Sequence, residues 1–270
     1  MKIIRSYKEI SEGVERIKNL NNRFITNFFL NEAKITNWIE DQTLLSIESS
    51  HSIFILRKHM DFLYLYYIST DFSELFRNLK DVHPIPDTDL VVEIVGKDGD
   101  FDQISSGFQP QGFVHHETLK RMFMLKNSPV DESELSAEIN FAAPSDSELV
   151  LDFLLKRLDK YSEQIPEIKE INAAIVNKNI LISKIDDEIA GLLYFEKTGF
   201  TSHLKEWLVN EKYRNNRIGS KLIKTYFYLC NNCNRFILWV KENNADAISK
   251  YEHYGYRMEH LKDIIMVKTK

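Results

Sequence analysis

The stretch 207-WLVNEKYRNNRIGSKLIKTYF-227 joins two local patterns across a short polar loop. Its first residues are apolar and continue an alternating segment, which is typical of a strand. From Arg217 onward apolar side chains recur at helical spacing, so we expect a helix to begin there. Arg214 and Arg217 lie in the loop, and Gly219 follows them. The first N–H groups of such a helix have no helical partner and attract a negatively charged ligand.

A phosphate or pyrophosphate is the ligand that best fits this junction. Arg214, Arg217 and Lys221 supply positive charge, and Gly219 is expected to let the ligand approach the backbone closely. Neither G-x-x-x-x-G-K-[ST] nor G-x-G-x-x-G occurs in the chain. We therefore exclude P-loop nucleoside triphosphatases and Rossmann dinucleotide enzymes.

The composition is typical of a globular protein with a sizeable hydrophobic core. Hydrophobic residues make up 43% of the 270 residues, and the formal net charge is −5. Residues 201–270 hold 13 Lys+Arg against 7 Asp+Glu, or +6, so the first 200 residues sum to −11. The overall acidity argues against a nucleic-acid partner, while the basic C-terminal region favours a small anionic ligand.

Neither a membrane span nor a metal site is expected. No apolar run has the length of a span, and the first residues lack a signal-peptide core, so we expect a cytoplasmic protein with no membrane partner. Cys230 and Cys233 form a lone C-x-x-C. Because no further zinc ligands stand at suitable spacing, we interpret both as structural cysteines at a helix end.

The chain divides near its middle at the polar stretch 126-KNSPVDESELSAE-138, which is typical of a linker. We predict an N-terminal domain at 1–127, a linker at 128–133 and a second domain at 134–270. Strands and helices alternate, which predicts an α/β (α+β) fold with a mixed sheet. The expected strands cover 51–58, 60–69, 90–96, 180–186, 188–197, 203–209, 235–241 and 263–270; the expected helices cover 71–82, 145–161, 166–179, 217–230 and 244–254.

The two halves share an internal pattern. Each ends with a strand, a helix, a glycine–aromatic pair and a last strand, the pairs being Gly112–Phe113 and Gly255–Tyr256. This order predicts a repeated unit. In the first half the strand before Asp71 passes directly into a helix without a glycine, and Asp71 or Ser73 can cap that helix. We therefore expect no phosphate site in the first half.

Residues 134–270 resemble the GNAT superfamily of acyl-CoA N-acyltransferases. The family signature [Q/R]-x-x-G-x-[G/A] reads Arg214-Asn215-Asn216-Arg217-Ile218-Gly219 here, with Arg217 in place of the first glycine. A second family block, N-x-x-A-x-x-x-Y-x-x-x-G-[FY], matches Asn244, Ala247, Tyr251, Gly255 and Tyr256. The resemblance implies a tandem GNAT-like architecture, with a degenerate N-terminal unit followed by a GNAT acetyltransferase domain.

The resemblance also implies an acetyl-CoA site in the second domain. The backbone of the loop would bind the pyrophosphate, through Arg214, Asn215, Asn216, Arg217, Ile218, Gly219 and Ser220. The backbone of Leu208 and Val209 would pair with the pantetheine arm, and one of these N–H groups would polarise the thioester carbonyl. Asn244 would contact the pantetheine.

N-acetylation needs a base for the attacking amine and benefits from an acid for the leaving thiolate. In several family members the base lies eleven residues before the signature, which here is His203. Glu206 is the second candidate; alternation along the strand places it opposite His203, Lys205, Trp207 and Val209 unless a bulge intervenes. A water relay is also open. Tyr251 is the candidate acid, and its competing interpretation is a core aromatic.

The implied function is an acetyl-CoA-dependent N-acetyltransferase that transfers the acetyl group to a primary amine by direct attack on the thioester. The alternative is a non-catalytic acyl-CoA-binding or interaction module on the same fold. The acceptor is a small-molecule amine or a peptide amine, and the sequence does not separate the two. Acyl-chain preference and oligomeric state also stay open.

Overall fold

The computed structural model describes residues 1–29, 32–82, 88–97, 101–125 and 131–270. The chain forms two compact units. The first unit contains Met1–Leu119 together with Leu261–Lys270, and the second contains Lys120–His260. Within the described ranges, no helix combines the length and the apolarity needed to cross a membrane.

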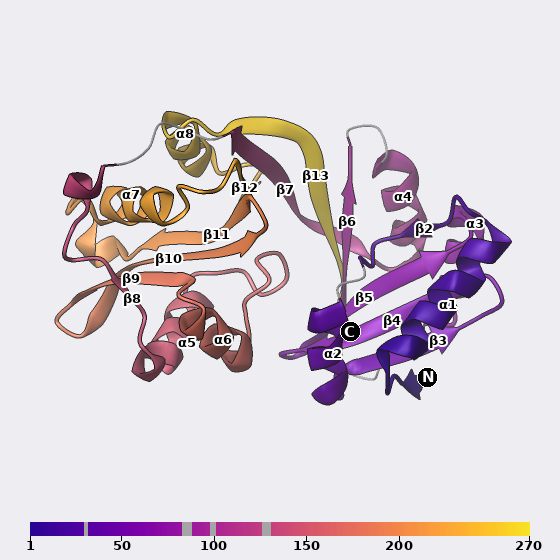
Figure 1. The fold of residues 1–270 in the computed structure, drawn as a ribbon. Helices are drawn as coiled ribbons and strands as arrows, with labels where there is room; N and C mark the ends of the chain where they lie inside the picture. Colours follow the sequence, from indigo (N-terminus) through magenta and orange to yellow (C-terminus); the bar gives the residue numbers. More distant parts are fainter. Residues whose placement is uncertain (30–31, 83–87, 98–100, 126–130) are drawn as a thin grey trace. The chain divides into compact units, whose positions relative to one another are not determined.

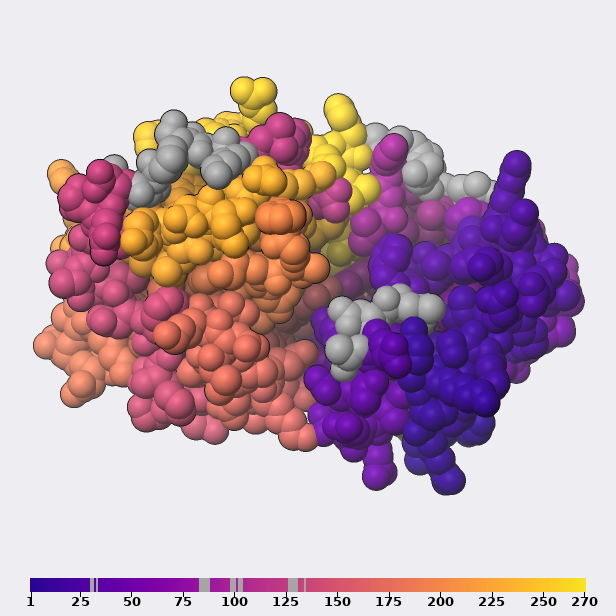
Figure 2. Space-filling view, in the orientation of Figure 1, coloured from indigo at the N-terminus to yellow at the C-terminus, as the bar shows by residue number. Residues whose placement is uncertain are grey.

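The first unit is a sheet with helices on both faces. Its strands follow the order β1-β3-β4-β5-β6-β13, and every neighbouring pair is antiparallel except β5 and β6. Helix α1 lies across one face of β3–β5 (Figure 1), and the indigo residues of α1 and α2 form most of this unit's visible face in Figure 2. The elements are β1 (Lys2–Ile3), α1 (Tyr7–Leu20), β2 (Ile25–Thr26), α2 (Glu32–Glu40), β3 (Leu44–Glu48), β4 (Ser52–His59), β5 (Phe62–Ser69), α3 (Phe72–Leu79), β6 (Asp89–Gly96), α4 (Phe101–Phe108), η1 (Gln109–Gln111) and the start of β7 (Val114–Leu125).

The second unit has the same plan. Strands β8, β9, β10 and β11 are antiparallel neighbours, and β12 adds to β11 in parallel. Helices α5 and α6 cover one face of these strands and α7 covers the other (Figure 1). Its elements are η2 (Glu132–Glu134), β8 (Asn140–Phe141), η3 (Pro144–Asp146), α5 (Ser147–Leu155), α6 (Ile168–Val176), β9 (Ile180–Ile185), β10 (Glu188–Thr198), β11 (Thr201–Val209), η4 (Glu211–Tyr213), α7 (Ile218–Leu229), β12 (Arg235–Lys241), α8 (Ala245–His253) and the start of β13 (Arg257–Lys268).

The predicted repeat is confirmed element by element. Each unit runs through two helices, three antiparallel strands, a helix, a parallel strand, a helix and a long strand. Gly112 and Gly255 both adopt left-handed backbone, at φ 88° and 93°, and the aromatic residues after them, Phe113 and Tyr256, are buried. Only glycine adopts that conformation without steric cost. Strand β2, between α1 and α2, is an element that the first unit has in addition.

The last strand does not stay in the second unit. Residues 262–268 pair with β6 in a register that runs from Lys262 opposite Gly96 to Lys268 opposite Leu90. The division between the units therefore differs from the predicted linker at 128–133, of which residues 128–130 lie outside the described ranges. A cut after residue 127 would remove β6 and leave residues 262–268 without that partner.

Helices α1 and α2 were not predicted, although α1 carries a recognisable signal. Ser6 caps α1 by accepting a hydrogen bond from the Glu9 N–H, at 3.4 Å. Ile10 and Ile17 of the same helix are buried against the sheet. A serine followed three residues later by a glutamate, before apolar residues at helical spacing, is the sequence pattern of a helix start.

The cysteines behave as predicted. Helix α7 ends at Leu229, and Cys230 and Cys233 follow as buried, free thiols in the core of the second unit. Burial raises the pKa of the Cys230 thiol to about 12. A thiol in that state is a packing group rather than a nucleophile.

Candidate active site

The predicted anion loop connects β11 to α7 and has an unusual backbone. Asn215 and Arg217 adopt left-handed conformations, at φ 74° and 57°. Arg217 therefore stands at the family's glycine position in a conformation that glycine favours. It is the N-cap of α7 but makes no side-chain capping bond. The N–H groups at the start of α7 thus lack the side-chain acceptor that usually satisfies them, which suits an anion.

The charges around the loop are not equivalent. Arg214 pairs with Glu211 at 2.8 Å, and Lys221 pairs with Glu138 at 2.7 Å. Arg217 has no ion pair within the described part of the chain and its side chain is exposed. Arg217 is therefore the loop cation that a pyrophosphate would meet without competition from a carboxylate.

Gly219 has a packing role in addition to the one expected. A Cβ at this position would lie 3.3 Å from Val209 and 3.4 Å from the indole of Trp207. The Trp207 Nε1–H also donates a hydrogen bond to the Gly219 carbonyl at 3.1 Å. The glycine thus lets α7 pack closely on β11, and its expected role in letting the ligand approach the backbone stays a prediction.

The side chains of the remaining loop residues lie in different environments. The Ile218 side chain is buried in the core, while Asn215 and Asn216 are exposed. The Ser220 hydroxyl accepts a hydrogen bond from the Tyr254 hydroxyl at 3.3 Å. These contacts hold the first turn of α7 in place.

Strands β11 and β12 pair only along their first residues. The register runs from Thr201 opposite Arg235 to Leu204 opposite Leu238, and the described residues show no further pair. We call residues 205–209, on the side away from β10, the open edge of β11. The Asn210 N–H donates to Ala190 of β10 at 2.9 Å. Because N–H direction alternates along a strand, Val209 presents its N–H to the open edge and Leu208 turns its own toward β10.

A β-bulge in β11 changes which side chains share a face. Tyr194 of β10 is opposite Glu206, but the next residue of β10 is opposite Leu204, so Lys205 is the extra residue. Leu204 and Trp207 consequently pack into the same core. The simple alternation expected from the sequence was wrong because the bulge inserts one residue. The bulge places the Glu206 side chain on the same face of β11 as the His203 side chain.

Glu206 lies where β11 and β12 separate. Its side chain is half-buried, and the described residues supply no hydrogen bond or ion pair to its carboxyl group. Burial and, to a smaller extent, the carboxylate of Glu163 raise its pKa to about 8, although Lys205 and Lys241 act in the opposite direction. His203 lies in the paired part of the strand, opposite Glu196 of β10. A carboxyl group that titrates near neutrality suits a general base.

Tyr251 of α8 interacts electrostatically with this carboxyl group. Its ring packs on Trp207, with centroids 5.7 Å apart, and on Tyr256, at 5.9 Å. Burial raises the pKa of its hydroxyl well above the usual value, and Glu206 and Glu163 raise it further. The hydroxyl therefore stays protonated at neutral pH and acts as a hydrogen-bond donor. The ring contacts agree with the core-aromatic interpretation, and the role of Tyr251 as the acid stays a prediction.

Asn244 is the N-cap of α8. Its Oδ1 accepts a hydrogen bond from the Ala247 N–H at 3.1 Å. The asparagine of the second block thus orients the helix that carries Tyr251. Its contact with pantetheine stays a prediction.

In the first unit the chain itself covers the corresponding edge. Strands β5 and β6 also pair only briefly, from Phe62 opposite Asp89 to Tyr64 opposite Val91. Strand β2 then pairs with β5. The Asn27 amide Nδ2 donates to the carbonyl oxygens of Leu65, at 3.1 Å, and Glu93, at 3.0 Å, and so bridges β5 and β6.

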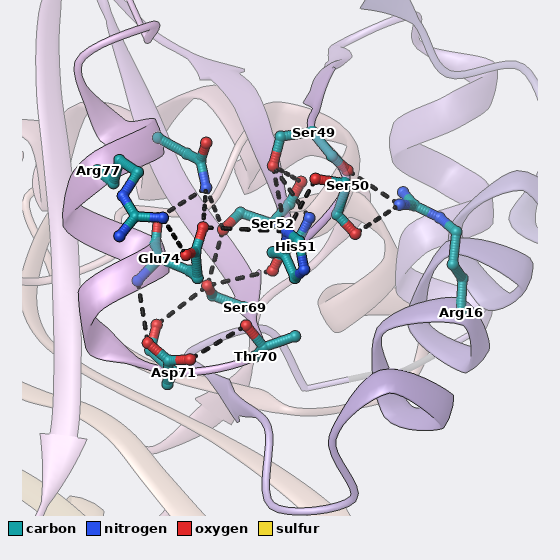
Figure 3. A network of polar contacts seen from close by, with 11 residues as sticks. Arg16, Ser49, Ser50, His51, Ser52, Ser69, Thr70, Asp71, Glu74 and Arg77 are labelled. Carbon is teal, nitrogen blue, oxygen red and sulfur yellow. Dashed lines mark hydrogen bonds and ion pairs between the residues drawn. The ribbon is translucent and has the colours of Figure 1, made fainter.

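At the junction between β5 and α3, polar side chains of the first unit form hydrogen bonds with the backbone and with one another (Figure 3). Asp71 caps α3 by accepting from the Glu74 N–H at 3.0 Å, which confirms it as the cap of the two candidates. The buried hydroxyl groups of Ser52 and Ser69 are 2.7 Å apart, and Ser69 also donates to the Asp71 carbonyl at 3.1 Å. These groups satisfy one another, in contrast to the uncapped start of α7.

Comparison with known proteins shows which family part of the second unit matches and which solved structures share the fold. Residues 149–256 match the Acetyltransferase (GNAT) family. A tandem GNAT protein from the clavulanic acid biosynthesis pathway aligns over 99% of this chain and 97% of its own, with a TM-score of 0.64 and 8% identity. A GCN5-related N-acetyltransferase from Sphaerobacter thermophilus aligns over 96% and 91%, with a TM-score of 0.58 and 11% identity. No curated protein matches the chain. At these identities the solved structures establish the tandem GNAT fold alone.

Proposed function

With residues 149–256 matching the GNAT acetyltransferase family, we propose that this chain is an acetyl-CoA-dependent N-acetyltransferase acting on a primary amine. The observation that carries the proposal is the open edge of β11, which has an uncapped helix start at one end and the unpaired Glu206 carboxyl group at the other. The loop at 214–220 would bind the pyrophosphate through backbone N–H groups and Arg217. The Val209 N–H would polarise the thioester carbonyl.

In the proposed reaction the Glu206 carboxylate takes a proton from the amine nitrogen as that nitrogen bonds to the acyl carbon. The carbon–sulfur bond of acetyl-CoA breaks, and the electron pair leaves with sulfur. The Tyr251 hydroxyl donates a hydrogen bond to this sulfur. A tyrosine hydroxyl is ordinarily a weaker acid than a thiol, and burial weakens Tyr251 further. Its proposed contribution is therefore a hydrogen bond to the thiolate rather than complete proton transfer.

Tyr251→Phe is expected to lower kcat by roughly 10²-fold while acetyl-CoA affinity changes little. The ring that packs on Trp207 is kept, and only the donor to the developing thiolate is lost. Stopped-flow thiol release measures the chemical step, and calorimetry measures affinity. An unchanged chemical step would return Tyr251 to a packing role.

One acetyl-CoA is expected per chain, bound by the second unit. In the first unit Asn27 bridges the two strands and Asp71 caps the helix, so neither the edge nor the helix start is available. Native mass spectrometry of the whole chain with acetyl-CoA counts the molecules bound. A second molecule bound at comparable affinity would contradict the assignment.

Thiol release from acetyl-CoA with a panel of small amines and peptide amines tests the function itself. The proposal predicts release that depends on the amine. Binding of acetyl-CoA without release for any amine would instead favour a non-catalytic acyl-CoA-binding module. Two free thiols in the core also fit the reducing cytoplasm, which we propose as the compartment.

A further inference from the structure

The turn between α5 and α6 holds one carboxylate in a fixed position. The Asp159 N–H donates to Glu163 Oε2 at 2.6 Å, and the Glu163 N–H donates to the Asp159 carbonyl at 3.1 Å. Asp159 Oδ1 in turn accepts from the N–H and the hydroxyl of Ser162, which is buried. This turn replaces the end of the helix predicted at 145–161, and α5 stops at Leu155.

Lys241 binds the same carboxylate from another part of the unit. Its Nζ is 3.1 Å from Glu163 Oε2, and both side chains are about three-quarters buried, with 26% and 23% exposed. Lys241 is the last residue of β12, the strand that separates from β11 beyond Leu238. The ion pair therefore joins the α5–α6 turn to the strand beside the open edge.

Both members of the pair act on the candidate base. Glu163 raises the pKa of Glu206 and Lys241 lowers it, in addition to the larger effect of burial. Lys205, the bulged residue, also lowers it. The negative group and the positive group act in opposite directions, so the balance between them shifts the pKa of the Glu206 carboxyl group.

Two tyrosines are also part of the surroundings of Glu206. Tyr251 of α8 interacts with it electrostatically, and Tyr194 is its cross-strand neighbour on β10. The pKa of Tyr194 is raised by burial first, then by Glu196, with smaller contributions from Glu170 and Glu206. Both tyrosines stay neutral through the working pH range, so Glu163, Lys241 and Lys205 are the charged groups that matter.

We propose that Glu163 and Lys241 form a positioning pair that sets how readily Glu206 accepts a proton from the acceptor amine. The inference rests on the proposed function, because it assigns the pair to that reaction. Glu163 needs no contact with the substrates: it acts through Glu206. The internal hydrogen bonds of the turn keep its carboxylate at one distance from the base, as electrostatic tuning requires.

The test is a pair of substitutions with opposite expected effects. Glu163→Gln removes the negative neighbour, so the midpoint of the acidic limb of kcat/KM should move down by about one pH unit. Lys241→Met removes the positive neighbour, so the midpoint should move up by a similar amount. The double variant should return close to the midpoint of the parent protein. Two exposed partners in the same unit serve as controls, Asp152→Asn and Lys156→Met, and neither should shift it.

A direct titration separates this inference from the proposed function. Carbon-13 NMR of labelled glutamate, with the Glu206 signal assigned through Glu206→Gln, follows the carboxyl group whether or not an amine is acetylated. Opposite shifts in the two single variants support the pair even if no acceptor is found. Unshifted titration in both folded variants overturns it, and Glu163→Asp, which keeps the charge but moves it by one methylene, should titrate closer to the parent than Glu163→Gln does. If Glu163→Gln does not fold, Lys241→Met alone decides.

Discussion

Glu206→Gln is expected to lower kcat/KM by about 10²–10⁴-fold, the usual contribution of a general base. The amide is close in size to the carboxyl group and cannot accept the proton. In the parent protein kcat/KM should rise with pH to a midpoint near 8, because Glu206 is protonated below its raised pKa and inactive as a base. Well below the midpoint, kcat/KM should fall ten-fold for each unit by which the pH is lowered. Steady-state kinetics from pH 5.5 to 9.5 measures both effects.

Two comparisons make this result specific to Glu206. Acceptor amines of different pKa should leave the midpoint near 8 in place, since a limb that belongs to the acceptor moves with it. His203→Gln should also keep the limb, because His203 lies in the paired part of β11. A limb near 6.5 that His203→Gln abolishes would make His203 the base instead. A limb that both variants retain would point to a water relay.

Gly219→Glu is expected to weaken acetyl-CoA binding by roughly 10²-fold or more. Two effects combine: the new side chain collides with Trp207 and Val209 beneath α7, and a negative charge enters the helix start. Overpacking typically costs about 1–3 kcal/mol. The glutamate also repels the pyrophosphate and competes with it for the positive helix start, an effect of about 0.3–1 kcal/mol. Isothermal titration calorimetry gives the affinity, and thermal unfolding shows whether the unit is still folded.

Two milder variants separate packing from charge in the same loop. Gly219→Ala adds only a Cβ at 3.3–3.4 Å from its nearest neighbours, so binding should weaken only a few-fold. Arg217→Gly removes the unpaired cation and relieves the left-handed backbone, so affinity should fall about five-fold with no loss of thermal stability. Unchanged affinity in Gly219→Glu would show that the loop is not the pyrophosphate site.

The sequence alone determined the features that depend on nearby residues. Helical spacing after Arg217 located α7, and the expected strands at 180–186 and 188–197 located β9 and β10. The glycine–aromatic pairs revealed the repeat. A position with left-handed backbone favours glycine, so the same glycine occurs at the matching place in both halves of the sequence. The capping of α3 by Asp71 was also local, since a cap and the N–H it binds lie three residues apart.

Only the tertiary structure decided which groups meet at the site. The bulge at Lys205 is a property of the register between β10 and β11, so β11 alone could not place Glu206 on the face of His203. Asn27 bridges residues 38 and 66 positions away, and Lys241 pairs with Glu163 78 positions away. The final strand pairs with β6 rather than within its own half for the same reason. Periodicity records which side of an element is apolar, but a partner distant in the chain is selected by packing that no local pattern encodes.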